Sequence, residues 1–372
     1  MSNNPFGDMF GDIMGMLGKT GPDAWFETAR TLSLNVARGA EGDPNPDPAL
    51  RARVEDFAPL IARHLTATFS LATEETFECV NRSTLADDAL TNWRPLIEPF
   101  ITASAPALPE AMMTNPLVGQ LASVLGPLMT GFQLGSVAGH FSENAWSLAA
   151  VPLPRQRHDR HVVVNNVEAF ATAWSLDVTT ALIFALAQEM VASEFLTQPG
   201  TTDALRAVLL DATRESLANQ GDIMTKLAGM VNPDDLASLM GSPESLLGSI
   251  DIPEETAANR EVNAAVAVLR AVFDYVALWI TEQIVGPAPL LREAYRRYLL
   301  NDAHGEEGAA ALFGITLRGP HQELALTFVD QVAEKYGIAT FSALLRADGL
   351  PRHEELPDAH QWVARVNSSP LA

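Results

Sequence analysis

Apolar side chains recur every three or four residues through most of the chain, which predicts a protein built mainly from α-helices. The pattern is clearest over residues 255–285, where it is carried by Val262, Val266, Leu269, Phe273, Val276, Ile280 and Ile284. Similar patterns predict helices over residues 21–38, 48–71, 90–104, 167–195, 321–336 and 358–367. We therefore expect a mostly α fold.

Strand signals are few and short. His161–Val164 is rich in β-branched residues, and Asn165 with Asn166 is expected to end it. Residues 41–48 form a turn-rich cluster in which Asp47 and Pro48 predict the N-cap and first turn of the following helix. Two or three short strands are the most that this sequence predicts.

Residues 111–142 contain no Asp, Glu, Lys or Arg. A membrane-spanning helix needs about 20 mostly apolar residues in a row, but Pro116, Pro127 and several polar residues interrupt this stretch. We therefore expect a buried helical hairpin rather than a membrane span. Gly135 and Gly139 have the spacing of small residues that allows two helices to pack closely.

The composition excludes several function classes. Lys and Arg number 24 against 46 Asp and Glu, giving a formal net charge of −22, which disfavours nucleic acid and anionic membrane surfaces as partners. Cys79 is the single cysteine, so no intramolecular disulfide or multi-cysteine zinc site can form, and a buried, inert thiol is expected. The sequence contains no phosphate-binding loop, dinucleotide fingerprint or nucleophile elbow.

The expected organisation is one compact unit. Residues 1–20 are predicted to be loosely ordered, residues 21–150 to form a helical region packed on the core, and residues 151–372 to form the core with the C-terminal helices. No basic cluster precedes the apolar residues of the N-terminus, and Asp8 and Asp12 lie among them. A secretory signal is therefore not expected, and we predict a cytoplasmic protein.

The candidate chemistry lies in the predicted central helix. Residues 180–187 are apolar on nearly every face, which indicates a buried helix, and Gln188 and Glu189 follow them directly. A buried carboxylate is costly unless it is protonated, hydrogen-bonded or paired with a cation. Glu189 therefore either lies at the rim, pairs with an arginine of a neighbouring helix, or marks a functional site.

Several segments in the same order along the chain resemble the actinobacterial zincin-like family, whose members are described as zinc-dependent metalloproteases or proposed hydrolases. The resemblance covers most of the chain. It is carried by Gly21–Trp25, Phe132–His140, Pro152–Pro154, Val162–Asn166, Leu312–Ile315, Phe328–Asp330, Tyr336–Ile338, Glu354–Asp358 and Trp362.

The resemblance implies a zincin-like helical domain whose central helix carries a His-Glu-x-x-His motif. In that motif two histidines bind Zn²⁺ and the glutamate activates a water molecule. Here the matching residues are Gln188, Glu189 and Ala192, so Glu189 occupies a vestigial general-base position and both histidines are absent. The family's acidic ligand on a later helix corresponds to Phe273, and Asp274 is a poor substitute because one helical residue rotates the side chain by about 100°.

We therefore expect a degenerate, catalytically inactive member that binds no zinc and needs no cofactor. The leading hypothesis is a pseudoenzyme that serves as a binding or scaffold protein for a protein partner or an active paralogue. A second hypothesis is an active hydrolase whose metal ligands are non-standard, drawn from His140, His158 or His161. A third is a small-ligand or peptide-binding protein that uses the vestigial cleft, with His140, Asp274 and Tyr275 as candidate pocket residues. The oligomeric state stays open.

The histidines also have simpler interpretations. His140 is expected to be a core histidine that bonds inward, toward Glu189. His158 and His161 flank a polar run, Asp159–Arg160, that is expected to be a solvated loop beside the predicted strand.

Overall fold

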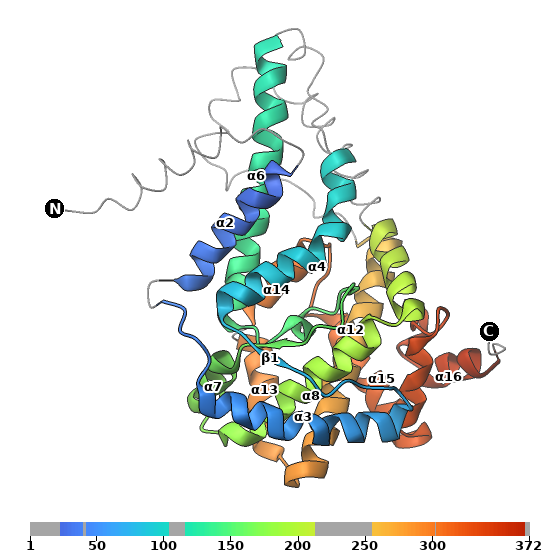
Figure 1. Ribbon diagram of the computed structural model, residues 1–372. Helices are drawn as coiled ribbons and strands as arrows, with labels where there is room; N and C mark the ends of the chain where they lie inside the picture. The colour runs from blue at the N-terminus through green and yellow to red at the C-terminus, as the bar shows by residue number, and fades with distance from the viewer. Residues whose placement is uncertain (1–22, 40–41, 104–115, 213–254, 302, 369–372) are drawn as a thin grey trace.

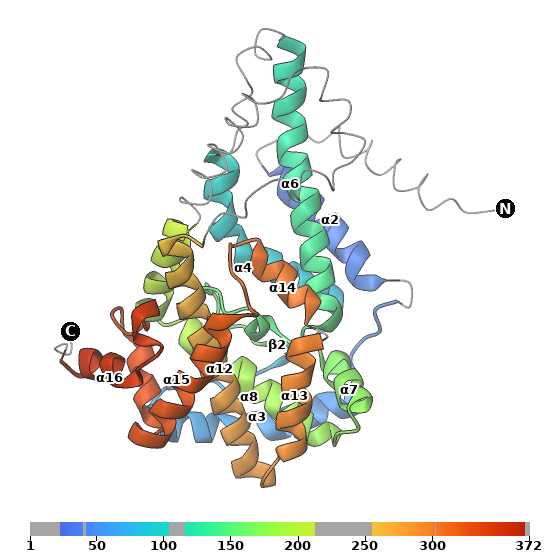
Figure 2. The ribbon, with the colours of Figure 1, turned by 180° about the vertical axis from the view of Figure 1, so that it is seen from behind.

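The innermost helix of the fold is α8 (Val178–Leu196), whose residues are all buried from Ala181 to Leu196. This is seen in the computed structural model, which describes residues 23–39, 42–103, 116–212, 255–301 and 303–368. The carboxylate of Asp177 caps α8 by accepting a hydrogen bond from the backbone N of Thr180 at 2.8 Å. Three helices pack against α8, namely α3 (Pro48–Phe69), α7 (Val164–Ala173) and α12 (Ala257–Val285), as Figures 1 and 2 show.

Most of the predicted helices are confirmed, and the mostly α fold with them. They are α2 (Ala24–Arg38), α3, α12, α15 (Pro320–Tyr336) and α16 (Ala359–Ser368). Asp47 caps α3 as expected, with its Oδ1 accepting from Ala49 N at 2.8 Å. Helix α15 packs on α12 and α16 packs on α15, while α13 (Pro289–Asn301) runs beside the core (Figure 2).

A second group of helices lies above this core in the view of Figure 1. It consists of α2, α4 (Arg82–Ala103), α6 (Pro116–Asn144) and α14 (His304–Ala311). Helix α4 begins well before the predicted residue 90 because the carboxylate of Asp43 accepts from the backbone N atoms of Arg82 and Ser83, at 2.9 and 2.8 Å. These bonds supply a cap that the spacing of apolar residues does not reveal.

The predicted hairpin over 110–143 is wrong for the part that the structure describes. Residues 116–144 form one continuous helix, α6, that passes through Pro127. A proline removes one backbone hydrogen bond and can bend a helix without ending it, and the later turns of α6 are held along α2.

The small residues of α6 lie where it crosses α2, as their spacing predicts. A Cβ atom added to Gly131 or Gly135 would lie 2.4 Å from the backbone oxygen of Trp25 or Ala29, respectively. A Cβ atom on Gly139 would lie 2.4 Å from the Cβ of Val36. The two helices therefore touch backbone to backbone over three successive turns.

The strand prediction is confirmed in place but not in length. His161 and Val162 form β2, which pairs in parallel with β1 (Glu78–Cys79), so that Cys79 lies opposite Val162. Helix α7 already begins at Val164, so Asn165 and Asn166 open a helix rather than end a strand. Cys79 is buried with a free thiol, and burial raises its pKa to about 11.

The single helix predicted over 167–195 is also wrong. Helix α7 ends at Ala173, Ser175 adopts a left-handed conformation with φ of 53°, and Asp177 starts α8. The backbone N of Leu176 bonds the oxygen of Ala171 at 2.8 Å and closes the end of α7. This turn lets α8 run into the core while α7 covers its start.

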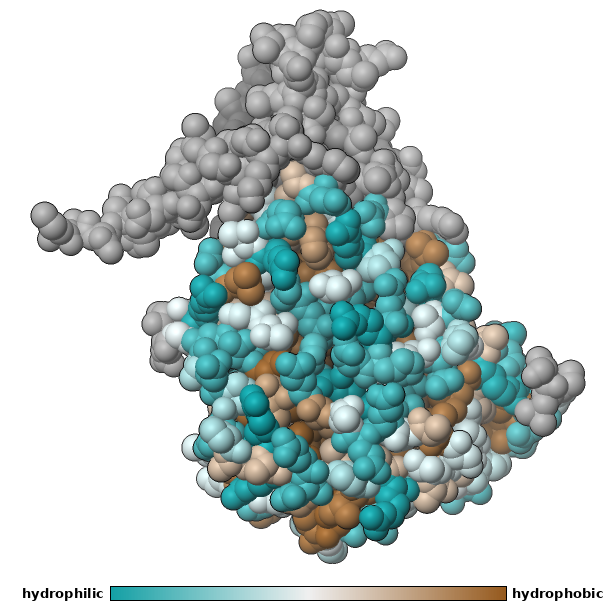
Figure 3. Space-filling model, in the orientation of Figure 1, coloured by the Kyte–Doolittle hydropathy of each residue, from teal (hydrophilic) through white to brown (hydrophobic). Residues whose placement is uncertain are grey.

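Several contacts join the predicted regions 21–150 and 151–372: β1 pairs with β2, α3 packs on α8, and α14 packs on α6. The prediction for residues 1–20 lies outside the described residues. Helices α8 and α12 are long and apolar enough to span a membrane, but most of each is buried inside the fold, as expected of core helices. Hydrophilic residues cover most of the face shown in Figure 3.

Candidate functional site

The four positions that the sequence predicts to correspond to the family's motif are all enclosed in the interior. Gln188, Glu189, Ala192 and Phe273 are 3%, 1%, 0% and 0% exposed. The first three lie on α8, which is buried on every side, and Phe273 lies on the neighbouring α12. Any chemistry at these positions therefore depends on the side chains packed against them.

Glu189 is held by a buried arginine. Both terminal nitrogens of Arg155 bond the carboxylate: Nη1 bonds Oε1, and Nη2 bonds Oε2 at 3.0 Å. The backbone N of Ala149, in the short helix η1 (Leu148–Ala150), donates to the same Oε2 at 3.2 Å. Arg155 is itself 5% exposed, and its backbone N is bonded to the oxygen of Leu196 at 3.1 Å. The carboxylate is thus neutralised by a fork of charge-assisted hydrogen bonds.

A second ion pair lies one turn along α8. Arg160 bonds Ser193 Oγ through its Nε at 2.6 Å and pairs with Glu194 through its Nη2. Its Nη1 donates to the backbone oxygen of Glu74 at 2.8 Å. Burial raises the pKa of Glu194, against the opposing effect of Arg160. Arg155 and Arg160, at the two ends of the loop 155–160, therefore each form an ion pair with a glutamate of α8.

That loop corrects the sequence interpretation of residues 155–161. Arg157, His158 and Asp159 are exposed as expected, but Arg155 and Arg160 are buried. The interpretation of Glu189 as the partner of an arginine is confirmed, although the arginine comes from a loop rather than from a helix. Sequence alone missed Arg155 and Arg160 because nothing in a polar run marks which cations turn inward.

Gln188 belongs to a separate buried network. Its Nε2 donates to Asp274 Oδ1 at 2.5 Å and to the hydroxyl oxygen of Tyr295 at 2.7 Å, and that hydroxyl donates to Asp274 Oδ1 at 3.1 Å. Burial raises the pKa of Asp274 to about 6, although Arg270 and the bond from Gln188 oppose the rise. Burial likewise raises the pKa of Tyr295 well above its ordinary value.

Another buried ion pair, between Arg270 and Glu306, lies close to this network. Arg270 Nη2 donates to Glu306 Oε2 at 2.5 Å, and the hydroxyl of Tyr298 donates to Glu306 Oε1 at 3.1 Å. Burial raises the pKa of Glu306, and Arg270 opposes this effect. Helices α12, α13 and α14 are therefore linked by polar contacts that lie beside Gln188 and Asp274.

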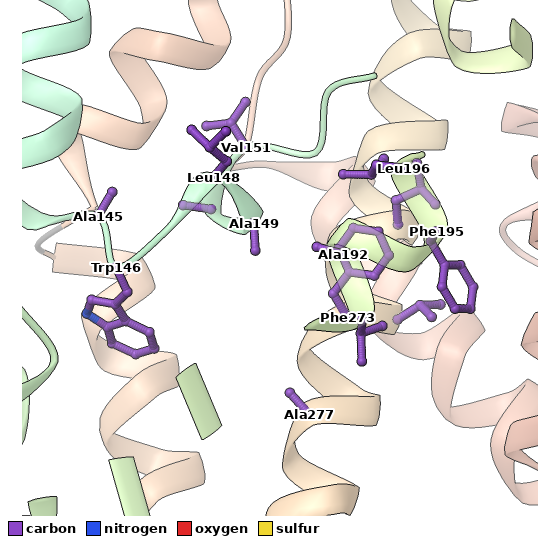
Figure 4. Close-up of a cluster of buried hydrophobic side chains, with 14 of the residues drawn as sticks. Ala145, Trp146, Leu148, Ala149, Val151, Ala192, Phe195, Leu196, Phe273 and Ala277 are labelled. Atoms are coloured by element: carbon purple, nitrogen blue, oxygen red, sulfur yellow. The ribbon is translucent and has the colours of Figure 1, made fainter. Parts of the chain in front are cut away.

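Asp274, not Phe273, faces Gln188. The ring of Phe273 packs on Phe195 with centroids 5.9 Å apart, and Phe195 in turn packs on Phe69 at 5.4 Å. Figure 4 shows Phe273 close to Ala192 and Phe195 in an apolar cluster. Tyr275, the third residue of this segment, is half-buried with its ring 6.3 Å from that of Phe341.

The histidines named as candidate ligands lie elsewhere. His140 is exposed on α6, and its Nδ1 lies 3.2 Å from Glu143 rather than near Glu189. His158 bonds Thr197 Oγ1 at 3.1 Å in the exposed part of the loop. His161 Nδ1 lies 3.0 Å from Asp88 Oδ2. None of the three bonds Gln188 or Glu189.

The family model described as zincin-like metallopeptidase matches residues 25–363 of this chain. The chain belongs to the zincin-like metallopeptidase family. A solved structure from Chloroflexus aurantiacus, described as a proposed hydrolase with a novel fold, is similar with a TM-score of 0.60. It is 16% identical in sequence, over 92% of this chain and 98% of that chain. No curated protein matches this chain.

A zincin-like metallopeptidase site needs three protein ligands and an open position for water. Gln188, Ala192 and Phe273, the predicted ligand positions of this chain, offer an amide that is already bonded twice, a methyl group and a phenyl ring. A divalent cation beside Glu189 would also meet the guanidinium of Arg155. Within the described part of the chain, no three His, Cys, Asp or Glu side chains are grouped to hold a metal ion. These residues do not fit a catalytic zinc.

Proposed function

We propose that this chain is a non-catalytic member of the zincin-like metallopeptidase family that works as a binding or scaffold protein. The observation that supports this most directly is the ion pair between Glu189 and Arg155. A general base must accept a proton from a water molecule within hydrogen-bond reach. The Glu189 carboxylate is enclosed and accepts from Arg155 and from the backbone N of Ala149 instead.

The substitutions around Glu189 support the same proposal because they are mutually compatible. Arg155 supplies the positive charge that a bound metal would otherwise bring next to this carboxylate, and Gln188 satisfies Asp274 and Tyr295. A buried carboxylate without a cation would destabilise the fold. These buried contacts are those of a structural core. We infer that they replace the metal chemistry of the family, and that this chemistry has not moved to another site of the chain.

An active hydrolase with non-standard ligands would require at least one of His140, His158 and His161 to reach a common metal position. Their partners are Glu143, Thr197 and Asp88, on different parts of the molecule. Binding of a small ligand in the vestigial cleft would require space at Gln188, Glu189, Ala192 and Phe273, which are all closed in. Actinobacterial origin, a cytoplasmic location and a protein partner or paralogue remain predictions from the sequence.

The proposal is tested with the purified full chain and a mixture of fluorogenic peptides, assayed with added Zn²⁺ and with a chelator. The expected result is no hydrolysis above that of the Glu189→Gln variant, which keeps the shape of the side chain and removes its charge. Hydrolysis that Zn²⁺ supports, and that both the chelator and this substitution abolish, would overturn the proposal.

A further inference from the structure

A cleft lies between α7, the end of α6 and α13. Its volume is about 180 Å³, and it is lined by residues that include Arg82, Glu143, Trp146, Asn166, Trp174 and Tyr298. It contains none of the residues of the Gln188–Glu189 cluster. The cleft is therefore a different site from that around Gln188 and Glu189.

Aromatic rings form the wall of the cleft. Phe170 lies at the centre, with its ring 4.9 Å from that of Trp146, 5.4 Å from that of Tyr298 and 6.4 Å from that of Trp174. Trp146 and Tyr298 are nearly parallel, at 5.8 Å. Such a surface favours a flat or bulky apolar group, because aromatic pairs add to the free energy of simple burial.

Arg82 brings a positive charge to this wall. Its Nε donates to Asn166 Oδ1 at 2.8 Å, and Asn166 is itself fixed by bonds from its Nδ2 to the backbone oxygens of Ser142 and Ala145, at 3.0 and 2.8 Å. The two terminal nitrogens of Arg82 make no hydrogen bond or ion pair with any residue that the structure describes. A guanidinium fixed at Nε with both terminal nitrogens free is arranged for bidentate binding of a carboxylate.

The indole of Trp146 supplies a second unsatisfied donor. Trp146 is 5% exposed, and its Nε1 is buried with no hydrogen-bond partner in the described part of the chain. Figure 4 shows this nitrogen on the edge of the ring that is turned away from Ala192 and Phe273. Buried donors in proteins nearly always have a partner, and Trp146 is one of the residues that line this cleft.

We propose that this cleft binds a small carboxylate with an aromatic or bulky apolar body. The carboxylate lies on Arg82, and the apolar body lies against Phe170, Trp174 and Tyr298, next to the buried indole of Trp146. A free amino acid and the C-terminal residue of a peptide share this chemistry. For a free amino acid, the carboxylate of Glu143, which is half-buried in the lining, is a partner for the ammonium group.

The test titrates the full-length protein with L-phenylalanine, N-acetyl-L-phenylalanine and L-phenylalaninamide. Binding is followed by calorimetry and by the indole N–H signal of Trp146 in two-dimensional NMR, which a Trp146→Phe variant assigns. The two carboxylates are expected to bind saturably and to shift that signal, whereas the amide should bind about tenfold more weakly or worse. Preference for the free amino acid indicates that its ammonium group is recognised, and preference for the acetylated form indicates a peptide end.

Arg82→Met is the matched variant, since it keeps most of the apolar stem and removes the charge. It should weaken binding of both carboxylates by about tenfold or more. Arg63→Met, which removes an exposed arginine from α3, should leave binding unchanged. Equal binding of the amide, unchanged binding by Arg82→Met, or no saturable binding of either carboxylate would overturn the proposal. None of these outcomes bears on whether the chain hydrolyses peptides.

Discussion

The cation that faces a buried carboxylate decides what the carboxylate can do. Facing a metal-bound water, a glutamate is a base. Facing a guanidinium in a closed interior, it is a structural anion whose removal leaves an unpaired charge. Glu189 is in the second state, because Arg155 bonds both of its oxygens and both side chains are almost wholly buried.

Substitution of either partner alone should therefore destabilise the fold strongly. We expect Arg155→Met and Glu189→Met each to lower the free energy of unfolding by about 3–5 kcal/mol, because each leaves a buried charge without its partner. The double variant should lose much less than the sum of the two, which denaturant unfolding of the four proteins measures. Additive losses would show that the two side chains are not coupled and would contradict the assigned ion pair.

Asp274 makes stability depend on pH. Its pKa is raised from 3.8 to about 6 in the folded protein, so between these values the folded state binds more protons than the unfolded state. The contribution of this group to stability is complete below about pH 4 and is lost as the pH rises to about 6. The loss is at most about 3 kcal/mol.

Asp274→Asn isolates this effect, because the amide oxygen can still accept from Gln188 and Tyr295 while the charge is gone. Urea unfolding at several pH values should show the variant gaining stability relative to the wild type between about pH 4 and pH 6, with little change above. All other carboxylates are common to the two proteins and cancel in the difference. A difference that is flat over this range would contradict a raised pKa at Asp274.

At the residue scale, the sequence singled out Glu189 and offered an arginine as one possible partner, but it did not show which arginine that is. Glu189 stands out because it interrupts an apolar helix. Arg155 and Arg160 do not stand out, because they lie in a polar run whose exposed members look the same in sequence. Likewise, the alignment that places Phe273 at a ligand position could not show that Asp274 is the residue that meets Gln188.

At the scale of elements, hydrophobic spacing predicts the long helices well and their interruptions poorly. Helices α12 and α15 lie where the spacing places them, because one apolar face determines each of them. The break before α8 depends on a local cap at Asp177, and the early start of α4 depends on bonds from Asp43, which is distant in sequence. The apolar spacing reveals neither. The strand at β2 is short because Val164 already belongs to a helix.

The crossing of α2 and α6 gives a prediction at this scale. Gly135→Ala should lower stability by about 1–3 kcal/mol, because the new methyl group would lie 2.4 Å from the backbone oxygen of Ala29. Gly308→Ala is the matched control. This glycine is exposed in α14 with nothing within 4 Å of an added Cβ, so the substitution should be neutral or stabilising by up to about 1 kcal/mol.

Thermal and denaturant unfolding of the two glycine variants provide the measurement. Similar stabilities for both would mean that α2 and α6 do not pack backbone to backbone. A loss for Gly308→Ala alone would have the same meaning.

At the scale of the whole molecule, the chain belongs to the zincin-like family, and no group of three His, Cys, Asp or Glu side chains in its described residues could hold a metal ion. The chain has the fold of a Chloroflexus aurantiacus protein that is 16% identical, so the packing of apolar helices defines this fold more than any particular side chain. In this chain, ion pairs and hydrogen bonds of Arg155, Arg160, Gln188 and Asp274 fill the centre of that architecture. The central claim is that such a centre has no place for a divalent metal.

The most direct test of that claim is the zinc content of the full-length protein, produced in zinc-supplemented medium, dialysed and analysed by mass spectrometry. A variant lacking His158 and His161 controls for adventitious binding in the loop. The account predicts zinc far below one ion per chain, and the same value for Glu189→Gln. Close to one tightly held zinc per chain, lost in Glu189→Gln and kept in the histidine variant, would contradict it.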